Sequence, residues 1–130
     1  MTGSYYYQND EEIELLNGSD NRKVLLSFDV PSGEVLDFLA NLTTREQEKK
    51  NNKIWFELVQ DGQVVATSVD KTNKSDADNL SMALLYQAKM DTDSTFEVVA
   101  QTFTRTHRIP ETQLQIGYKT YGQGLELTLL

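Results

Sequence analysis

Alternation of apolar and polar side chains with a period of two residues recurs along most of the chain and constrains its fold more than any other feature. The longest run lies between Leu80 and Met90, and Ile54, Phe56 and Leu58 carry a shorter one. Successive side chains of a β-strand point to opposite faces of the sheet, so this period is typical of strands with a buried face. We therefore expect an all-β protein with roughly seven to nine short strands.

Further alternating runs fill most of the remaining sequence. They cover residues 13–16, 24–30, 64–69, 96–103, 114–118 and 125–130. Residues 34–42 fit both a helical face and a strand; we favour the strand because Asn41, Thr43 and Thr44 are poor helix formers and the neighbouring segments alternate. The last run ends in two leucines, and it is expected inside a sheet, because an exposed apolar edge invites aggregation.

Turn residues between these runs indicate how the strands are joined. Asp61 and Gly62 tolerate the positive φ angles of a primed turn, which predicts a β-hairpin between residues 54–59 and 64–69. The polar residues 91–94 predict a second hairpin in the same way. Short strands separated by turns favour an antiparallel β-sandwich.

The length of the chain sets its domain organisation. A chain of 130 residues that is 38% hydrophobic is long enough for one core and too short for two. We expect residues 13–130 to form a single β-sandwich domain. Residues 1–12 combine Tyr5, Tyr6 and Tyr7 with acidic residues, and we expect them to form an extended arm that binds a partner.

Charge and composition exclude several classes of function. Twelve Lys and Arg against twenty Asp and Glu give a net charge of −8, which argues against duplex nucleic acid or an anionic membrane as a partner. The chain has no cysteine and a single histidine, His107, which we expect in a solvated loop. No catalytic constellation is apparent, so the sequence predicts a protein that is not an enzyme and needs no cofactor.

Two pairs of aspartates are the only candidates for a metal site. Asp76 with Asp78 and Asp91 with Asp93 have a spacing at which both carboxylates of a pair can reach one hard cation. Neither pair continues into the pattern of a calcium-binding loop, and both lie in turn-forming segments. We predict no metal site.

Several predicted strands carry large apolar side chains on both faces. Such a strand needs cover from the core on one side and from a loop or a second subunit on the other. The side chains that point away from the predicted core are candidates for a subunit interface, although a thick core would also bury them. They are Trp55, Val59, Leu85, Val99 and Phe103.

The order of these segments resembles the jelly-roll domains of the tumour-necrosis-factor and complement-globular-head type. The resemblance covers roughly residues 24–130 and is carried by segments 28–34, 55–62, 80–98 and 125–130. It implies a jelly-roll β-sandwich that forms homotrimers through an apolar sheet face. The sequence departs from these jelly rolls at Asp93, Ser94 and Thr95, where they usually carry Gly-Asp. An immunoglobulin-like sandwich is the alternative, because it fits the strand count nearly as well.

Similar small trimers serve in tailed-phage virions as capsid decoration or fibre-tip proteins. The resemblance therefore implies a structural protein of the virion, assembled in the host cytoplasm, that self-associates and attaches to a larger assembly such as a capsid. The alternative is a cytoplasmic module that binds carbohydrate or calcium, in which Trp55, Tyr118 or Tyr121 stacks on a sugar.

Overall fold

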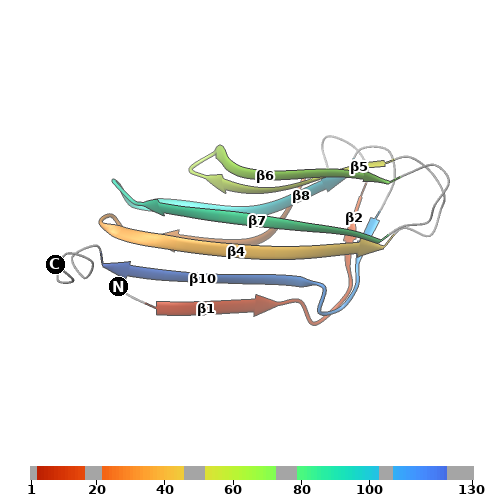
Figure 1. Ribbon diagram of the computed structural model, residues 1–130, viewed down its shortest axis with the longest axis horizontal. Coiled ribbons are helices and arrows are strands. Elements are labelled where there is room, and N and C mark those ends of the chain that lie inside the picture. The colour runs from red at the N-terminus through yellow and green to blue at the C-terminus, as the bar shows by residue number, and fades with distance from the viewer. Residues whose placement is uncertain (1–2, 17–21, 46–51, 73–78, 103–106, 123–130) are drawn as a thin grey trace.

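The computed structural model describes residues 3–16, 22–45, 52–72, 79–102 and 107–122 as an antiparallel β-sandwich, which confirms the predicted all-β class (Figure 1). Sheet A has six strands, in the order β1-β10-β4-β9-β2 with β7 paired to β4, and sheet B has four, in the order β3-β8-β5-β6. The strands are β1 (Gly3–Gln8), β2 (Ile13–Leu15), β3 (Lys23–Val30), β4 (Glu34–Arg45), β5 (Asn52–Gln60), β6 (Gln63–Thr72), β7 (Asn79–Lys89), β8 (Ser94–Thr102), β9 (His107–Ile109) and β10 (Leu114–Gly122).

The pairing of the strands is concentric. The central strands β5 and β6 form a hairpin, and around it β4 pairs with β7, β3 with β8, β2 with β9 and β1 with β10, all antiparallel. This order is that of the jelly roll, in which a long antiparallel ribbon is rolled up so that its strand pairs are distributed between two sheets. The immunoglobulin-like alternative pairs its strands in a different order.

The turn between β5 and β6 has the predicted geometry. Asp61 has a φ of 48° and Gly62 a φ of 85°, so both central residues adopt the left-handed conformation of a primed turn. Gln60 then pairs with Gln63, and the hairpin prediction is confirmed.

The second predicted hairpin, through residues 91–94, is wrong. Strand β7 pairs with β4 in sheet A, whereas β8 lies between β3 and β5 in sheet B, so this turn carries the chain from one sheet to the other. Its side chains bind the neighbouring crossover between β3 and β4, where the Ser32 amide donates to Asp93 Oδ1 at 2.9 Å. Alternation and turn residues look the same for a hairpin and for a crossover, so the sequence does not distinguish them.

The ambiguous segment 34–42 is a strand, as favoured, and it lies at the centre of sheet A. Strand β4 continues to Arg45 and pairs with β10 along one edge and β7 along the other. Leu36, Phe38, Ala40 and Leu42 are buried, so the period of two decides this element.

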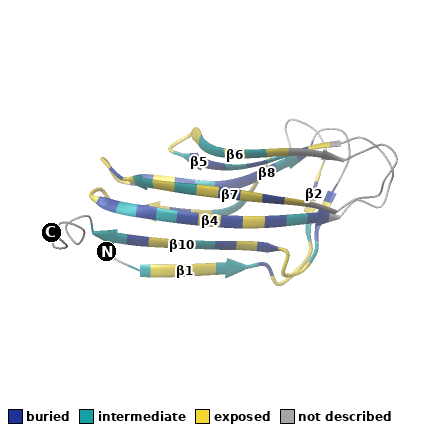
Figure 2. Ribbon diagram, viewed as in Figure 1, coloured by how far each residue is buried: buried dark blue, intermediate teal, exposed yellow. Residues whose placement is uncertain are grey.

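The core lies between the inner faces of the two sheets (Figure 2). Phe28 is its aromatic centre: its ring stacks on Phe96 with centroids 5.3 Å apart and on Phe38 with centroids 6.0 Å apart. Each such side chain contributes about 1.5–3 kcal/mol through removal of apolar surface from water. The largest fully buried side chains are Leu15, Leu36, Leu42, Ile54, Phe56, Leu58, Leu84, Met90, Phe96, Ile109, Leu114 and Ile116.

The N-terminal residues do not form the predicted free arm. Residues 3–8 are strand β1, which pairs along its whole length with β10 at the edge of sheet A. Asn9 follows, buried, and its side chain accepts a hydrogen bond from the Leu114 amide at 2.9 Å and donates one to the Pro110 carbonyl at 3.0 Å. The domain therefore includes residues that the sequence placed outside it, because β1 pairs with the edge of β10 that β4 does not cover.

His107 is also placed differently from the expectation of a solvated loop. It opens β9, is fully buried, and its Nδ1 lies 3.3 Å from Thr44 Oγ1. A three-residue strand is too short to show alternation in the sequence. The expected terminal strand at residues 125–130 lies outside the described residues. The residues that the structure describes contain no helix with the length and hydropathy needed to cross a membrane.

Candidate functional site

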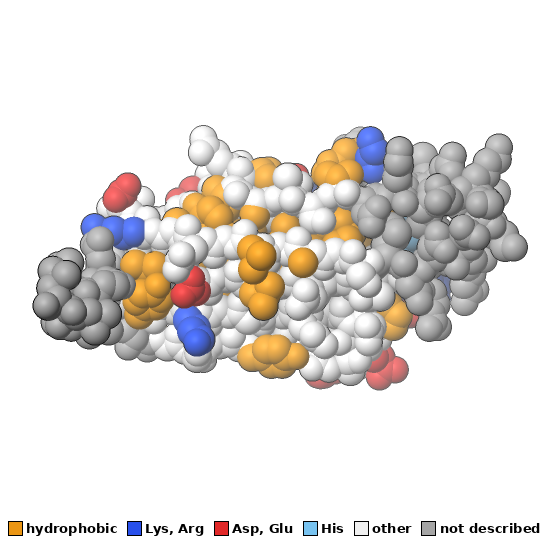
Figure 3. Space-filling view, viewed as in Figure 1, with side chains coloured by type: hydrophobic (Ala, Val, Ile, Leu, Met, Phe, Trp, Pro, Cys, Tyr) orange, Lys and Arg blue, Asp and Glu red, His pale blue; other side chains and the backbone are white. Residues whose placement is uncertain are grey.

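The outer face of sheet A carries a row of exposed apolar side chains that crosses four strands. Tyr6 on β1, Gly117 on β10, Leu39 on β4 and Leu85 on β7 lie side by side in register. Tyr6 is 67% exposed, Leu39 47% and Leu85 72%. Figure 3 shows apolar side chains grouped over β4 and β7 on this face, with another over β1. We call these four residues the apolar row.

Gly117 leaves a hollow in the apolar row, because it has no side chain between those of Tyr6 and Leu39. The hollow has a volume of about 410 Å³, and its walls include Ser4, Leu39, Leu85 and Lys119. A Cβ atom added at Gly117 would meet nothing closer than the Tyr5 carbonyl oxygen at 4.0 Å. The space above Gly117 is therefore open to a side chain from outside the molecule.

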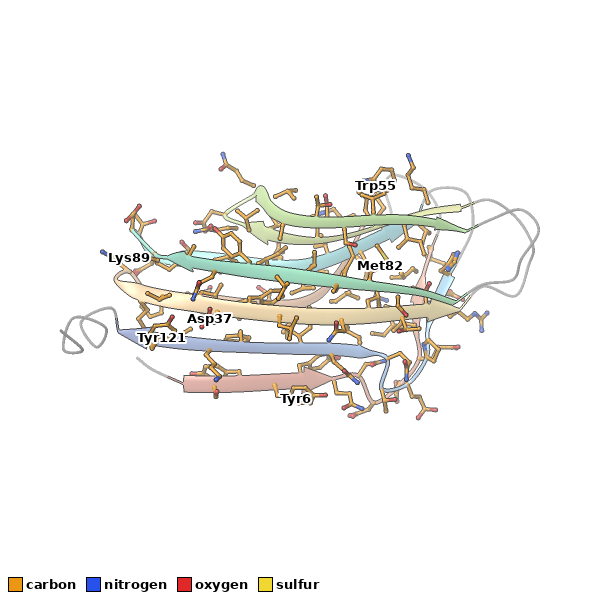
Figure 4. The ribbon with its side chains drawn as sticks, viewed as in Figure 1. Tyr6, Asp37, Trp55, Met82, Lys89 and Tyr121 are labelled. Carbon is orange, nitrogen blue, oxygen red and sulfur yellow. The ribbon has the colours of Figure 1, made fainter. Side chains whose placement is uncertain are left out.

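A charged row runs beside the apolar row. Lys119 on β10 lies opposite Asp37 on β4, with Ser4 and Gln87 on the outer strands. Figure 4 labels Asp37 on β4, left of the centre of this face, and Figure 3 shows one acidic and one basic side chain next to each other there. In the part of the chain that the structure describes, neither Lys119 nor Asp37 forms an ion pair.

The outer face of sheet B holds three of the predicted interface residues. Trp55 on β5 is paired with Val69 on β6 and with Gln101 on β8. Val59 on β5 and Val99 on β8 lie further along the same face. Val59 is only 2% exposed and Val99 only 1%. The chain therefore already buries them without a second subunit.

The predicted interface residues thus do not meet on one surface. Trp55, Val59 and Val99 lie on the outer face of sheet B, Leu85 lies on that of sheet A, and Phe103 is outside the described residues. Leu85 alone of the described four is largely exposed. The link between Leu85 and Tyr6, Leu39 and Gly117 could not be predicted, because only the register of β1, β10, β4 and β7 brings them together.

The three consecutive tyrosines are divided between the two faces of β1. Tyr6 points outward, whereas Tyr7 packs against the core and Tyr5 stacks on Tyr118 with ring centroids 4.8 Å apart. Tyr118 in turn stacks on Phe28 at 4.1 Å. Burial, with a smaller effect of Tyr5, raises the pKa of Tyr118 above its usual value. Tyr6 is 67% exposed and Tyr5 43%, so of the three Tyr6 offers the largest part of its side chain to a partner.

The residues proposed for carbohydrate binding do not form a common platform. Tyr118 stacks between Tyr5 and Phe28, and Tyr121 accepts a hydrogen bond from Gln87 at 3.3 Å. Trp55 lies on the other sheet, with the ammonium of Lys53 5.2 Å from its ring centroid. Each ring was a separate candidate for stacking on a sugar, and the structure does not bring the three together at one site.

The aspartates of the β7–β8 turn act as turn residues. Asp93 accepts a hydrogen bond from the Ser32 amide, and the Asp91 carbonyl accepts one from the Ser32 hydroxyl at 3.1 Å. The described residues contain no group of three or more His, Asp or Glu side chains that could hold a metal ion. Asp76 and Asp78 lie outside the described residues.

No protein-family model and no curated protein sequence matches the chain. A structure of infectious bursal disease virus, Gt strain, matches with a TM-score of 0.60 and 12% identity, over 95% of this chain and 34% of that chain. The Gx strain matches with a TM-score of 0.59 and 11% identity, over 95% and 33%. The VP2 subviral particle of the same virus gives 0.57 and 10%, over 91% and 32%.

These matches concern the fold. The chain spans about a third of the length of the virus chains that it matches, and the identities are near 10%. They support the jelly-roll assignment over nearly the whole chain, whose fold resembles that of part of the chains in these virus and subviral-particle structures.

Proposed function

We propose that the chain is a non-enzymatic structural component of a virion, which self-associates and attaches to a larger capsid assembly. The observation that carries this proposal is the jelly-roll match to virus particle structures over 95% of the chain. The apolar row supports it, because exposed apolar side chains in a contiguous set mark surfaces that bind other proteins. A shell component needs such surfaces and no reactive group.

The finer parts of the proposal follow from the resemblance to trimeric jelly rolls. We propose a homotrimer that decorates a capsid or forms a fibre tip, assembled in the host cytoplasm and retained in the virion. Of its candidate interface residues, Trp55 lies on the outer face of sheet B and Leu85 on that of sheet A, whereas Val59 and Val99 are buried by their own chain and Phe103 lies outside the described residues. Of the tyrosines proposed for attachment, Tyr6 is the one whose exposure suits that role.

Purified virus particles from producing cells test the proposed function. We expect the chain to sediment with the particles through a density gradient and to resist removal by washing at 1 M salt, since apolar contacts gain rather than lose strength in salt. Quantitative mass spectrometry should find many copies per particle, in fixed ratio to the main coat protein. Recovery of the chain only in the soluble fraction would refute the virion role.

A further inference from the structure

We propose that the outer face of sheet A is a self-complementary interface that binds the same face of a second copy of this chain. The two copies would be related by a two-fold axis that runs parallel to the strands, midway between β10 and β4. The inference rests on the proposed function, for which it supplies one contact between copies.

The two-fold operation places the apolar row against itself with matching shape. It exchanges β10 with β4 and β1 with β7, because these strands lie at equal distances on either side of the axis. Leu39 then enters the hollow over Gly117 of the partner copy, and Tyr6 faces the partner's Leu85. Each of these contacts occurs twice, as in every two-fold interface.

The charged row is complementary under the same operation. Lys119 faces the partner's Asp37, and Asp37 faces the partner's Lys119, so the interface gains two ion pairs between residues that form none within the described chain. An apolar ligand or a uniformly charged partner would leave one of these charges without its opposite. A second copy satisfies both, and this identifies the occupant.

The size of the face sets the expected strength. Four strands about 4.8 Å apart, with about nine residues each at about 3.3 Å per residue, give roughly 600 Å² per copy. The total of roughly 1,200 Å² is at the low end for specific protein interfaces. We therefore expect self-association that depends on concentration in the micromolar to millimolar range. A two-fold contact through sheet A can coexist with a trimer that is formed through the outer face of sheet B, as in dihedral assemblies.

Charge reversal tests the pairing. Asp37→Lys alone or Lys119→Asp alone sets like charges opposite each other at both symmetric positions, and each variant should self-associate at least about tenfold more weakly than the wild type. An equimolar mixture of the two variants restores both opposite-charge pairs across the interface. Sedimentation velocity should therefore show a heterodimer whose affinity is within about threefold of the wild-type dimer. Absence of that heterodimer, while the wild type dimerises, would overturn the inference.

Gly117→Leu tests the hollow independently of charge. The new side chain fills the space that Leu39 of the second copy needs, and it meets no atom of its own chain closer than 4.0 Å at Cβ. We expect loss of dimerisation with an unchanged melting temperature at low protein concentration. Gln63→Leu, at the exposed β5–β6 turn, adds the same side chain elsewhere and should leave dimerisation unchanged.

The outcomes separate this inference from the proposed function. If Gly117→Leu self-associates as the wild type does, the interface is elsewhere and the inference fails, although a virion role through another face would stand. If the chain dimerises as described but is absent from particles, the interface stands and the virion role fails. A wild type that stays monomeric up to 1 mM would overturn the interface.

Discussion

Leu84→Ala should lower the free energy of unfolding by about 2–5 kcal/mol, whereas Leu85→Ala should change it by no more than about 0.5 kcal/mol. The two leucines are adjacent on β7, but Leu84 is 2% exposed in the core and Leu85 is 72% exposed on the outer face. The same atoms are removed in both variants, so the difference measures burial alone. Urea unfolding at low protein concentration, where one copy is present, gives both values.

Leu85→Ala should have its effect on association instead. Leu85→Ala removes a side chain of the apolar row, so the dissociation constant of the dimer should rise. Leu84→Ala should mainly lower the free energy of unfolding, and the protein that remains folded should still dimerise. Similar losses of stability at both positions would show that Leu85 is covered within the single chain. The outer face of sheet A would then not be available to a second copy.

Deletion of residues 1–8 should destabilise the domain by about 3 kcal/mol and lower its melting temperature by about 10 °C. The deletion removes β1, uncovers the edge of β10, and takes away the rings of Tyr5 and Tyr7 from Tyr118 and the core. An uncovered strand edge also promotes aggregation, which light scattering on heating would detect. Differential scanning calorimetry measures the shift.

Tyr6→Ser is the matched control for this deletion. Tyr6 belongs to the same strand but is 67% exposed on the outer face, so its loss should leave the melting temperature within about 2 °C of the wild type. An unchanged melting temperature after removal of the whole segment would contradict the pairing of β1 with β10. Residues 1–12 would then be the external arm that the sequence suggested.

Much of the fold could be predicted because alternation is a local property. The buried faces of β4, β5 and β7 follow from the period of two, as Phe38, Phe56 and Leu84 show. The β5–β6 hairpin follows from the backbone preference of Asp61 and Gly62. These features can be predicted without knowing which distant strands pair with each other.

The candidate surface could not be predicted because it depends on pairing between distant strands. Tyr6 and Gly117 are neighbours only because β1 pairs with β10, and Leu39 and Leu85 only because β4 pairs with β7. Val99 shows the converse: an apolar side chain on an outer face is buried there by its own chain. The number of apolar residues on a face does not reveal which of them stay exposed.

The central claim is that exposed side chains of sheet A make this protein a self-assembling unit. Its most direct test is the molar mass of the purified chain in solution, measured as a function of protein concentration. Multi-angle light scattering or sedimentation equilibrium should give 14.8 kDa in dilute solution and a rise towards two or more copies as the concentration approaches the millimolar range. A mass that stays at 14.8 kDa throughout that range would contradict the account.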